Sequence, residues 1–364
     1  MSDKIRKIST RLFSLLDGFF PTKKHIIFSC RAANDYADNA KYLFEYFLNK
    51  NEKVYFYTKN RQVLSKIPGK ALYAYHWKTP FILLRSKVLV LTHGAFDFFP
   101  YFFKPNKKRT VINLFHAIPV KKIEEPPLAE KNFWNYFVVS SEFEKDFTHK
   151  NLKLNKDSIV VTGQPRNDQL KTLSDTKHPK KKRILFAPTF RDNDITQLFP
   201  FPDKDLKALD NYLKENNTSI AIRLHINEEK VYKKSAMFQN LTHIFFEGST
   251  VYPDVTEVLP QYSAVITDYS SVYIDFLLLD RPVAFIPYDY TEYQKVRGFS
   301  FPYFDYTPGP KINTQEELKS FISNLSMGQN PYAEQAKKIK HIFHQKTEKR
   351  ACEQLFNLIK EHAR

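Results

Sequence analysis

Cysteine and glycine are both scarce in this chain, and each shortage excludes a class of protein. Only two cysteines occur among 364 residues, Cys30 and Cys352, far apart and without metal-ligand spacing. A disulfide framework and a zinc ribbon are therefore excluded, and a reducing compartment fits the low cysteine content. The 8 glycines include neither a Walker loop nor a Gly-x-Gly-x-x-Gly turn, so P-loop and simple dinucleotide-binding proteins are excluded as well.

Long apolar runs are also missing. No stretch approaches the roughly 18 apolar residues that a membrane-spanning helix needs. Charges interrupt the apolar residues near the start, unlike those of a secretory signal. We therefore expect a protein that is soluble or peripheral to a membrane, and cytoplasmic.

Positive charge is abundant. Lys and Arg number 56 against 39 Asp and Glu, which leaves a formal net charge of +17. Such an excess indicates a polyanionic partner: a nucleic acid, an anionic membrane surface or a phosphorylated substrate. The apolar content of 42%, with 15% aromatic residues, is typical of a well-packed globular protein. A length of 364 residues predicts two domains of similar size.

The first 24 residues form a basic segment of their own. Lysines and arginines alternate with apolar residues between positions 4 and 20, and Pro21 follows. A helix with this pattern would be basic and amphipathic, which suits it to the surface of an anionic membrane. Packing of the helix on its own domain is the alternative, and the pattern does not separate the two.

Strands alternate with helices along the rest of the chain. We expect strands at residues 25–30, 53–58, 87–92, 110–115 and 136–140, and again at 184–187, 219–224, 243–246, 264–267 and 282–286. This alternation predicts βαβ units and parallel sheets. A lysine-rich stretch at 171–183 is the expected linker. We therefore expect a basic N-terminal segment at 1–24, α/β domains at 25–172 and 183–330, and C-terminal helices at 331–364.

Polar clusters follow several of these strands. The turn from Thr267 to Ser271 stands between a buried strand and a helix, at the carboxyl edge of a sheet, where open α/β sheets bind ligands. Ser270 and Ser271 at the helix start predict a cap that also binds phosphate, with an ordinary helix cap as the alternative. A carboxylate beside a phosphate is unfavourable, so we expect Asp268 to orient the turn through backbone or arginine contacts.

A metal site is not required by these clusters. No carboxylate cluster resembles a divalent-metal site, although Asp268, Asp275 and Asp289 leave a metal ion open. A nucleoside diphosphate held by hydroxyl groups, arginines and helix starts needs no metal. We therefore expect no cofactor.

A series of short motifs occurs in a fixed order along the chain. The series runs Tyr36-Ala-Asp-Asn-Ala-Lys41, Phe115-His-Ala-Ile-Pro-Val-Lys-Lys122, Thr162-Gly-Gln-Pro-Arg-Asn-Asp168, Ala187-Pro-Thr-Phe-Arg191, Arg223-Leu-His225, Ile266-Thr-Asp-Tyr-Ser-Ser-Val272, Arg281-Pro282, Tyr288-Asp289, Arg297-Gly-Phe299 and Pro308-Gly-Pro310. In this order the motifs resemble those of the CDP-glycerol glycerophosphotransferases, which build teichoic acids and related phosphate-containing capsules. The resemblance covers most of the chain.

The resemblance implies the GT-B fold, in which two Rossmann-like domains with parallel sheets face each other across the active site. The acceptor domain would be 25–172 and the CDP-donor-binding domain 183–330. His116 corresponds to the family's proposed general base, and His225 to a second essential histidine that would contact the pyrophosphate. The implied substrate-binding residues are Lys121, Arg166, Thr189, Arg191, Arg223, Thr267, Asp268, Ser270, Ser271, Asp289 and Arg297.

The implied reaction transfers glycerol phosphate, or a related polyol phosphate, from CDP-glycerol to an acceptor and releases CMP. The implied partners are a CDP-polyol donor, a lipid-linked or saccharide acceptor and an anionic membrane surface, without nucleic acid, at the cytoplasmic face of the cell membrane. A GT-B glycosyltransferase that uses a nucleotide sugar for capsule or surface polysaccharide synthesis is the alternative. The motifs do not separate glycerol from ribitol, or a primase from a polymerase.

The chain departs from the family's pattern at two positions. Ala117 stands where the family has a glycine, which would allow positive φ or close backbone approach, and Ile226 stands where it has a proline. Either change indicates an altered acceptor or donor. His93, in Thr92-His93-Gly94, also follows a strand and rivals His116 as the base, but it lacks the proline and lysine that follow His116.

Overall fold

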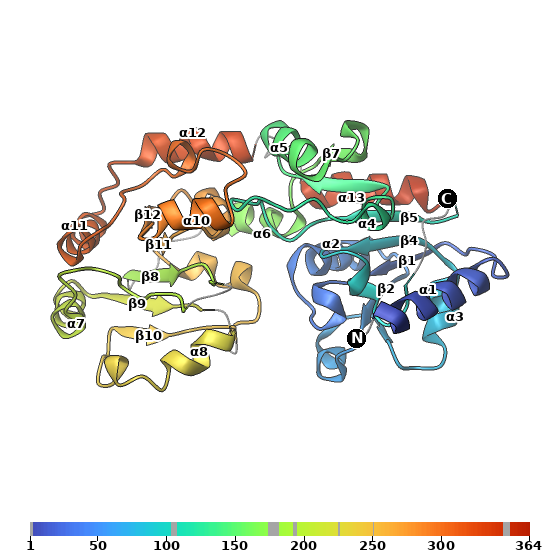
Figure 1. Cartoon of the computed structure of the whole chain (residues 1–364), viewed down its shortest axis with the longest axis horizontal. Coiled ribbons are helices and arrows are strands. Elements are labelled where there is room, and N and C mark those ends of the chain that lie inside the picture. The colour runs from blue at the N-terminus through green and yellow to red at the C-terminus, as the bar shows by residue number, and fades with distance from the viewer. Residues whose placement is uncertain are drawn as a thin grey trace. The chain divides into compact units, whose positions relative to one another are not determined.

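The computed structural model describes residues 3–102, 108–173, 182–191, 195–224, 226–249, 251–344 and 350–364. The chain divides into two compact α/β units, each built on one parallel sheet (Figure 1). The first unit comprises Met1–Ala117, Glu124–Asp168 and His344–Arg364, and the second comprises Ile118–Ile123 and Gln169–Phe343. The expected α/β class with parallel sheets is therefore confirmed.

Seven parallel strands form the sheet of the first unit, in the order β3-β2-β1-β4-β5-β6-β7. Their bounds are β1 His25–Phe28, β2 Val54–Thr58, β3 Lys70–Tyr73, β4 Ser86–Leu91, β5 Thr110–Asn113, β6 Tyr136–Val139 and β7 Ile159–Val161. The sequence pattern missed β3 and β7, which are the two edge strands. β3 begins with the exposed Lys70, and β7 is an apolar run of only three residues, Ile159–Val161, so neither has the longer apolar run of a central parallel strand.

Helices surround this sheet. Their bounds are α1 Asp3–Asp17, α2 Asp38–Asn49, α3 Thr79–Leu84, α4 Leu128–Lys131, α5 Glu142–Leu152, α6 Pro165–Leu173 and α13 Ala351–His362. Helix α13 comes from the end of the chain, yet Leu355 and Ile359 are fully buried in the same core as Phe44 and Phe47 of α2. Its apolar face therefore completes the first core.

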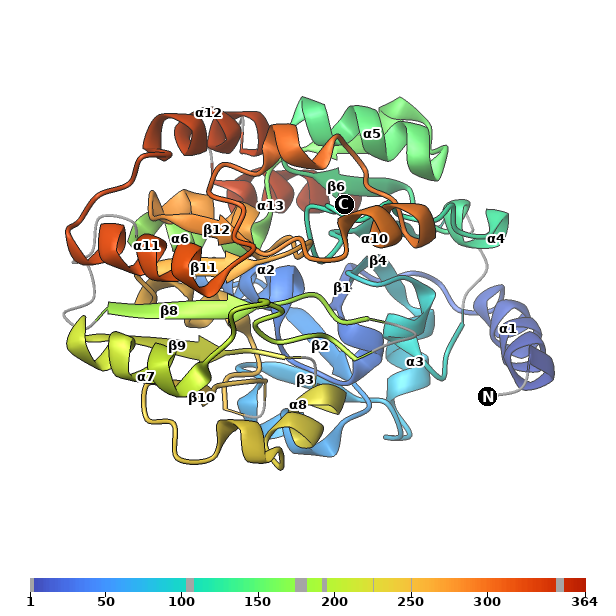
Figure 2. The same cartoon turned by 60° about the vertical axis from the view of Figure 1, so that its left-hand side comes forward.

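Five parallel strands form the sheet of the second unit, in the order β10-β9-β8-β11-β12 (Figure 2). They are β8 Lys182–Ala187, β9 Thr218–Ile222, β10 Ile244–Phe246, β11 Ala264–Thr267 and β12 Val283–Phe285. All five were expected from the sequence. The helices are α7 Leu206–Glu215, α8 Ile226–Tyr232, α9 Val272–Phe276, α10 Tyr290–Val296, α11 Gln315–Ser326 and α12 Ala333–Phe343.

Both sheets are doubly wound, and this winding decides where a ligand site can form. In the first sheet, β2 and β3 lie on one side of β1, and β4 to β7 lie on its other side, so the strand order reverses between β1 and β4. In the second sheet the strand order reverses in the same way between β8 and β11. Ligands of open α/β sheets bind at the carboxyl ends of the strands beside such a reversal. The polar turns that follow β4, β8 and β11 lie at these points.

Candidate active site

A pair of histidines lies at the carboxyl edge of the first sheet. His93 follows β4 and His116 follows β5, and these two strands are neighbours. Their imidazole rings stack with centroids 4.1 Å apart and an interplanar angle of 10°. The structure thus brings together the two residues that the sequence presented as rivals.

The backbone around His116 is held by a buried network. Arg166 donates from Nη1 to Asp38 Oδ1 at 2.9 Å and also to the His116 carbonyl oxygen. Asn39 donates from Nδ2 to the Phe115 carbonyl oxygen at 2.8 Å. Asp38 and Asn39 were not among the predicted site residues, although the Tyr36-Ala-Asp-Asn motif contained them. Arg166 therefore orients the loop that carries His116.

Charge in this network is balanced by the ion pair. Burial is the largest effect and opposes ionisation of Asp38, but Arg166, together with Arg31 and the two histidines, lowers the pKa of this carboxyl group. The side chains of Arg166 and Asp38 are only 5% and 6% exposed. A pair this deeply buried is costly to break, because removal of one partner leaves the other charge uncompensated.

His116 itself is held as a neutral imidazole. Burial first, and the neighbouring His93 second, lower its pKa to about 3, against the opposing effect of Asp38. An interaction with the Thr92 backbone raises the pKa and so also opposes this shift. Nδ1 of the ring is buried and has no hydrogen-bond partner within the described residues.

The backbone near His116 shows that the loop does not need positive φ at position 117, where this chain has alanine and the family has glycine. Phe115 adopts a positive φ of 50°, whereas Ala117 is not among the residues with positive φ. The left-handed conformation thus falls two residues before the alanine. The replacement of glycine by Ala117 therefore imposes no strain of this kind on the loop.

A second cluster lies at the carboxyl ends of β8, β11 and β12, in the second unit. Asp268, almost fully buried, accepts the Thr189 N–H at 2.7 Å and the Tyr269 N–H at 2.5 Å. It also accepts from Arg191 Nη2 at 2.9 Å. The expectation that Asp268 orients its turn through backbone and arginine contacts is confirmed.

Arg191 is the centre of this cluster. Its Nε and Nη2 donate to the two carboxylate oxygens of Asp289 at 2.8 and 2.9 Å. Its guanidinium group also lies 5.0–5.2 Å from the ring centroids of Tyr269, Tyr288 and Tyr293. Burial disfavours the cation, but the bonds to Asp289 and Asp268 raise the pKa of Arg191. Arg191 thus joins three strand ends.

The serines next to this cluster do not cap the helix as predicted. Ser271 occupies the N-cap position of α9 in an α-helical conformation, and its side chain makes no capping bond there. The Ser270 hydroxyl accepts the Val272 N–H only at a long 3.4 Å. Because the chain enters the helix already in helical φ/ψ, the hydroxyl does not reach back to the free N–H groups. Both serines are half-buried and remain able to bond a ligand.

The remaining predicted residues lie at several places in the second unit. Thr267 is buried and donates to the Ala187 carbonyl oxygen at 2.6 Å, so it links β11 to β8. Arg223 follows β9 and donates to the Tyr252 carbonyl oxygen at 2.8 Å. Lys121 belongs to the second unit, where it pairs with Phe299 beside the exposed Arg297. His225 lies outside the described residues.

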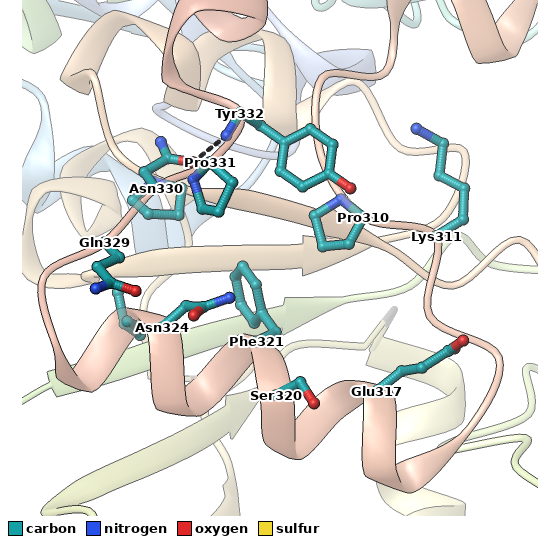
Figure 3. Close-up of a pocket in the computed structure, with 12 residues that line it drawn as sticks. Pro310, Lys311, Glu317, Ser320, Phe321, Asn324, Gln329, Asn330, Pro331 and Tyr332 are labelled. Atoms are coloured by element: carbon teal, nitrogen blue, oxygen red, sulfur yellow. Dashed lines mark hydrogen bonds between the residues drawn. The ribbon is translucent and has the colours of Figure 1, made fainter.

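The described residues include no group of three or more His, Cys, Asp or Glu side chains placed to hold a metal ion. The second unit also contains a cavity of about 440 Å³ between α11 and the 329–332 segment, lined by Phe321, Asn324 and Tyr332 among others (Figure 3). None of the predicted site residues line that cavity. In the part of the chain that the structure describes, no helix is long and apolar enough to cross a membrane.

Two doubly wound parallel sheets, each with a polar cluster at its carboxyl edge, define a GT-B-like transferase fold. The family model described as CDP-Glycerol:Poly(glycerophosphate) glycerophosphotransferase matches residues 12–361. The chain belongs to this family. The resemblance of its motifs is therefore confirmed.

Known relatives and structures agree with this assignment. The chain is 28% identical to the teichoic acid poly(ribitol-phosphate) polymerase of Bacillus spizizenii, over 87% of this chain and 54% of the relative. It is 24% identical to a teichoic acid poly(glycerol phosphate) polymerase of Staphylococcus epidermidis, over 85% and 47%. The structure of the wall teichoic acid polymerase TagF matches with a TM-score of 0.79 and 23% identity, over 98% of this chain and 94% of that one, and establishes the fold.

The chain spans about half the length of these two curated polymerases. A teichoic acid glycerol-phosphate transferase of Staphylococcus aureus, by contrast, is covered over 89% of its length at 24% identity.

Proposed function

We propose that this chain transfers a polyol phosphate from a CDP-polyol, such as CDP-glycerol, to a hydroxyl group of a lipid-linked or saccharide acceptor in teichoic acid or capsule polymer synthesis. The observation that carries the proposal is the neutral imidazole of His116, with an unbonded Nδ1, inside a motif of the glycerophosphotransferase family. Relatives named for ribitol phosphate and for glycerol phosphate are both similar to the chain, so both CDP-polyols are candidate donors.

His116 is the proposed general base. The acceptor oxygen attacks the β-phosphorus of the donor, the new O–P bond forms, and the bond between that phosphorus and CMP breaks. The hydroxyl proton passes to a ring nitrogen of His116, and CMP leaves with the bridging oxygen. A base with a pKa of about 3 is weak, but a pyrophosphate bound nearby brings negative charge that favours the protonated imidazole. Donor binding would therefore raise the basicity of His116 toward the working pH.

Ser270 and Ser271 are the proposed contacts of the donor phosphates. Thr267, Asp268 and Arg191 are already bonded to protein groups, which assigns them to holding the turn. The two serine hydroxyls, and Arg223 after β9, then donate hydrogen bonds to the phosphate oxygens. His225 is a further proposed contact. Such fixed donors stabilise charge that develops during phosphoryl transfer.

The test is CMP release by the purified protein with CDP-glycerol or CDP-ribitol and lipid-linked or saccharide acceptors, with product masses read by mass spectrometry. His116→Ala should lower the rate by roughly 10²–10⁴-fold while donor binding, measured by thermal shift, is retained. Turnover of a UDP- or CMP-sugar in place of both CDP-polyols would refute the proposal. So would a His116→Ala variant that transfers as fast as the wild type.

We further propose that α1 attaches the protein to an anionic membrane surface. Leu15 and Phe19 are 68% and 82% exposed, and Leu12 and Leu16 are exposed as well. On the opposite side, Phe13 packs against Tyr101 at 4.9 Å, and Asp17 forms a buried ion pair with Arg109. The helix is therefore packed on its unit and still presents a row of apolar side chains.

Positive charge adjoins this apolar row. A cavity of about 540 Å³ at the start of β1 is lined by Lys23, Lys24, Lys53 and Lys70. Lys23 is bonded through its N–H to the Arg85 carbonyl oxygen, and the Arg85 guanidinium group lies over Phe20. Apolar side chains beside several lysines are the combination that binds peripheral proteins to anionic lipid.

A further inference from the structure

His93 occupies the outer side of the histidine stack. His116 contacts two rings: His93 is stacked on one face with centroids 4.1 Å apart, and Phe115 is tilted by 44° with centroids 4.4 Å apart. His93 is exposed, whereas His116 is half-buried. His93 thus covers one face of the imidazole and is the contacting ring nearer to solvent.

The position of His93 is set independently of His116. The buried carboxylate of Asp97 accepts the N–H groups of Thr92 and His93 through Oδ2, at 2.8 and 2.9 Å, and that of Ala32 through Oδ1 at 2.6 Å. Gly94 follows with a φ of 115°, a conformation open to glycine and strained for other residues. The turn after β4 is therefore rigid before any contact with His116 is made.

The His93 side chain is fixed within the same turn. Its Nδ1 lies 2.7 Å from the Thr92 hydroxyl oxygen, which leaves little freedom for rotation of the ring. The turn consequently contacts His116 through the His93 ring, which covers the face of the His116 ring. This contact sets the plane of the imidazole.

We propose that His93 is a positioning residue for the base, a role that rests on the proposed function: its ring, stacked on His116, holds the plane of the imidazole so that a ring nitrogen is presented to the acceptor hydroxyl group. His93 itself neither accepts that proton nor contacts the reacting phosphorus. A base held in one orientation contributes more to the rate than a freely rotating one, since a misplacement of about 1 Å can cost about 100-fold.

The stack also couples the two protonation equilibria. Two imidazolium ions in face-to-face contact repel each other, so the pair takes up one proton more readily than two. His93 accordingly lowers the pKa of His116. The other charged groups around the pair are Asp38 on α2, Arg166 on α6, and Asp97 and Arg31 from the short turns after β4 and β1. Removal of His93 leaves all four in place.

Three variants separate the parts of this proposal. His93→Ala removes the ring, His93→Phe keeps an aromatic face without a titratable group, and His76→Ala is the control. His76 is an exposed histidine that stacks on Trp77 in the same unit. Thermal unfolding and circular dichroism confirm that each variant is folded; if His93→Ala is not, His93→Phe and His93→Gln take its place.

The first measurement is an NMR titration of the His116 imidazole with ¹³C-labelled histidine, which requires no turnover. The titration midpoint should rise in both His93→Ala and His93→Phe, because the competing proton site is gone, and should not move in His76→Ala. An unchanged midpoint in both His93 variants overturns the proposed coupling and with it the inference.

The second measurement is the pH profile of kcat and the acceptor KM. His93→Ala should lower kcat by roughly 10- to 100-fold with little change in KM, while His93→Phe recovers most of kcat with a profile displaced to higher pH. Equal loss in His93→Phe and His93→Ala, or none in either, would contradict a role for the stacked face. If the wild type transfers no CDP-polyol, the proposed function fails, whereas the titration still decides whether His93 governs His116.

Discussion

Arg191 donates to Asp268 at 2.9 Å and thereby ties the turn after β8 to the turn after β11. The contact crosses the point where the winding of the second sheet reverses, and both side chains are less than a tenth exposed. The pair thus fixes the shape of the turn after β11. Asp289 completes the arrangement through its two bonds to the same guanidinium group.

Replacement of Arg191 should therefore be costly for stability. Arg191→Ala leaves Asp268 buried without its cation, and we expect a loss of about 3–5 kcal/mol in the free energy of unfolding. Arg191→Lys should also destabilise, because an ammonium group cannot bond two carboxylates in a planar fork. Urea unfolding measures both. Arg297→Ala, at an exposed position in the same unit, is the control and should change stability by less than about 0.5 kcal/mol; equal effects at the two sites would contradict the structural role.

The lowered pKa of His116 predicts a dependence of stability on pH. In the folded protein the pKa is about 3, below the ordinary 6.5, so the unfolded chain binds the proton more readily between these values. The free energy of unfolding should therefore fall as the pH drops from 6.5 toward 3, by up to about 1.4 kcal/mol per pH unit from this group. His116→Gln should flatten that slope in chemical unfolding, and His76→Gln should not. A slope that His116→Gln leaves intact would show that carboxylates alone produce it.

The exposed apolar residues at the end of α1 and just after it predict membrane binding that depends on these side chains. They are Leu12, Leu15, Leu16 and Phe19. The double substitution Leu15→Ser and Phe19→Ser removes two large apolar groups, each worth about 1.5–3 kcal/mol when fully buried. Partitioning onto vesicles that contain phosphatidylglycerol should weaken by about 100-fold, since about 3 kcal/mol corresponds to two factors of ten. Stability should hardly change, because both residues are already exposed.

Co-sedimentation with vesicles measures this partitioning. The matched control is Val231→Ser with Met327→Ser, which are equally exposed apolar positions in the second unit. Reduced binding in the control to the same extent would show that general surface hydrophobicity, and not α1, carries the attachment. Binding to zwitterionic vesicles as tight as to anionic ones would instead remove the role of the lysines near Lys23.

Gly309 should not tolerate a side chain. A Cβ at this position would lie 2.1 Å from the Val283 carbonyl oxygen, so Gly309→Ala must displace the backbone of β12. We expect a loss of about 1–3 kcal/mol, as for other overpacked sites, measured by thermal or urea unfolding. Gly18→Ala is the control, since a Cβ there would lie 3.4 Å from its nearest neighbour, the Leu15 carbonyl oxygen. A Gly309→Ala variant as stable as Gly18→Ala would mean that β12 can shift freely.

The local pattern of apolar and polar residues was enough to predict much of the architecture. The ten expected strands are present, because a central parallel strand is a short apolar run between polar turns. Alternation of strands and helices predicts a helix between the strands at 243–246 and 264–267, but the chain there forms two 3-10 turns, Val255–Glu257 and Leu259–Gln261. Pro260 within the second turn lacks the N–H that a regular helix needs, which explains the difference.

The sequence pattern predicted only part of the candidate site. Motif order pointed to His116, Asp268 and Ser270, because each follows a predicted strand. It did not show that Asp38 and Asn39 support the His116 loop, or that the segment of Lys121 belongs to the second unit. These contacts join residues 50 or more positions apart, and no local period encodes them.

The sequence by itself determined the α/β class, the family and the polar turns at the strand ends, since these depend on residue type, alternation and motif order. Only the tertiary structure decided which of those turns meet. Strand order placed β4 beside β5 and so stacked His93 on His116. It also placed β11 between β8 and β12, and so brought Arg191 together with Asp268 and Asp289. The physical reason is that pairing of distant strands sets these neighbours, and such pairing is a property of the whole packed core and not of any short stretch.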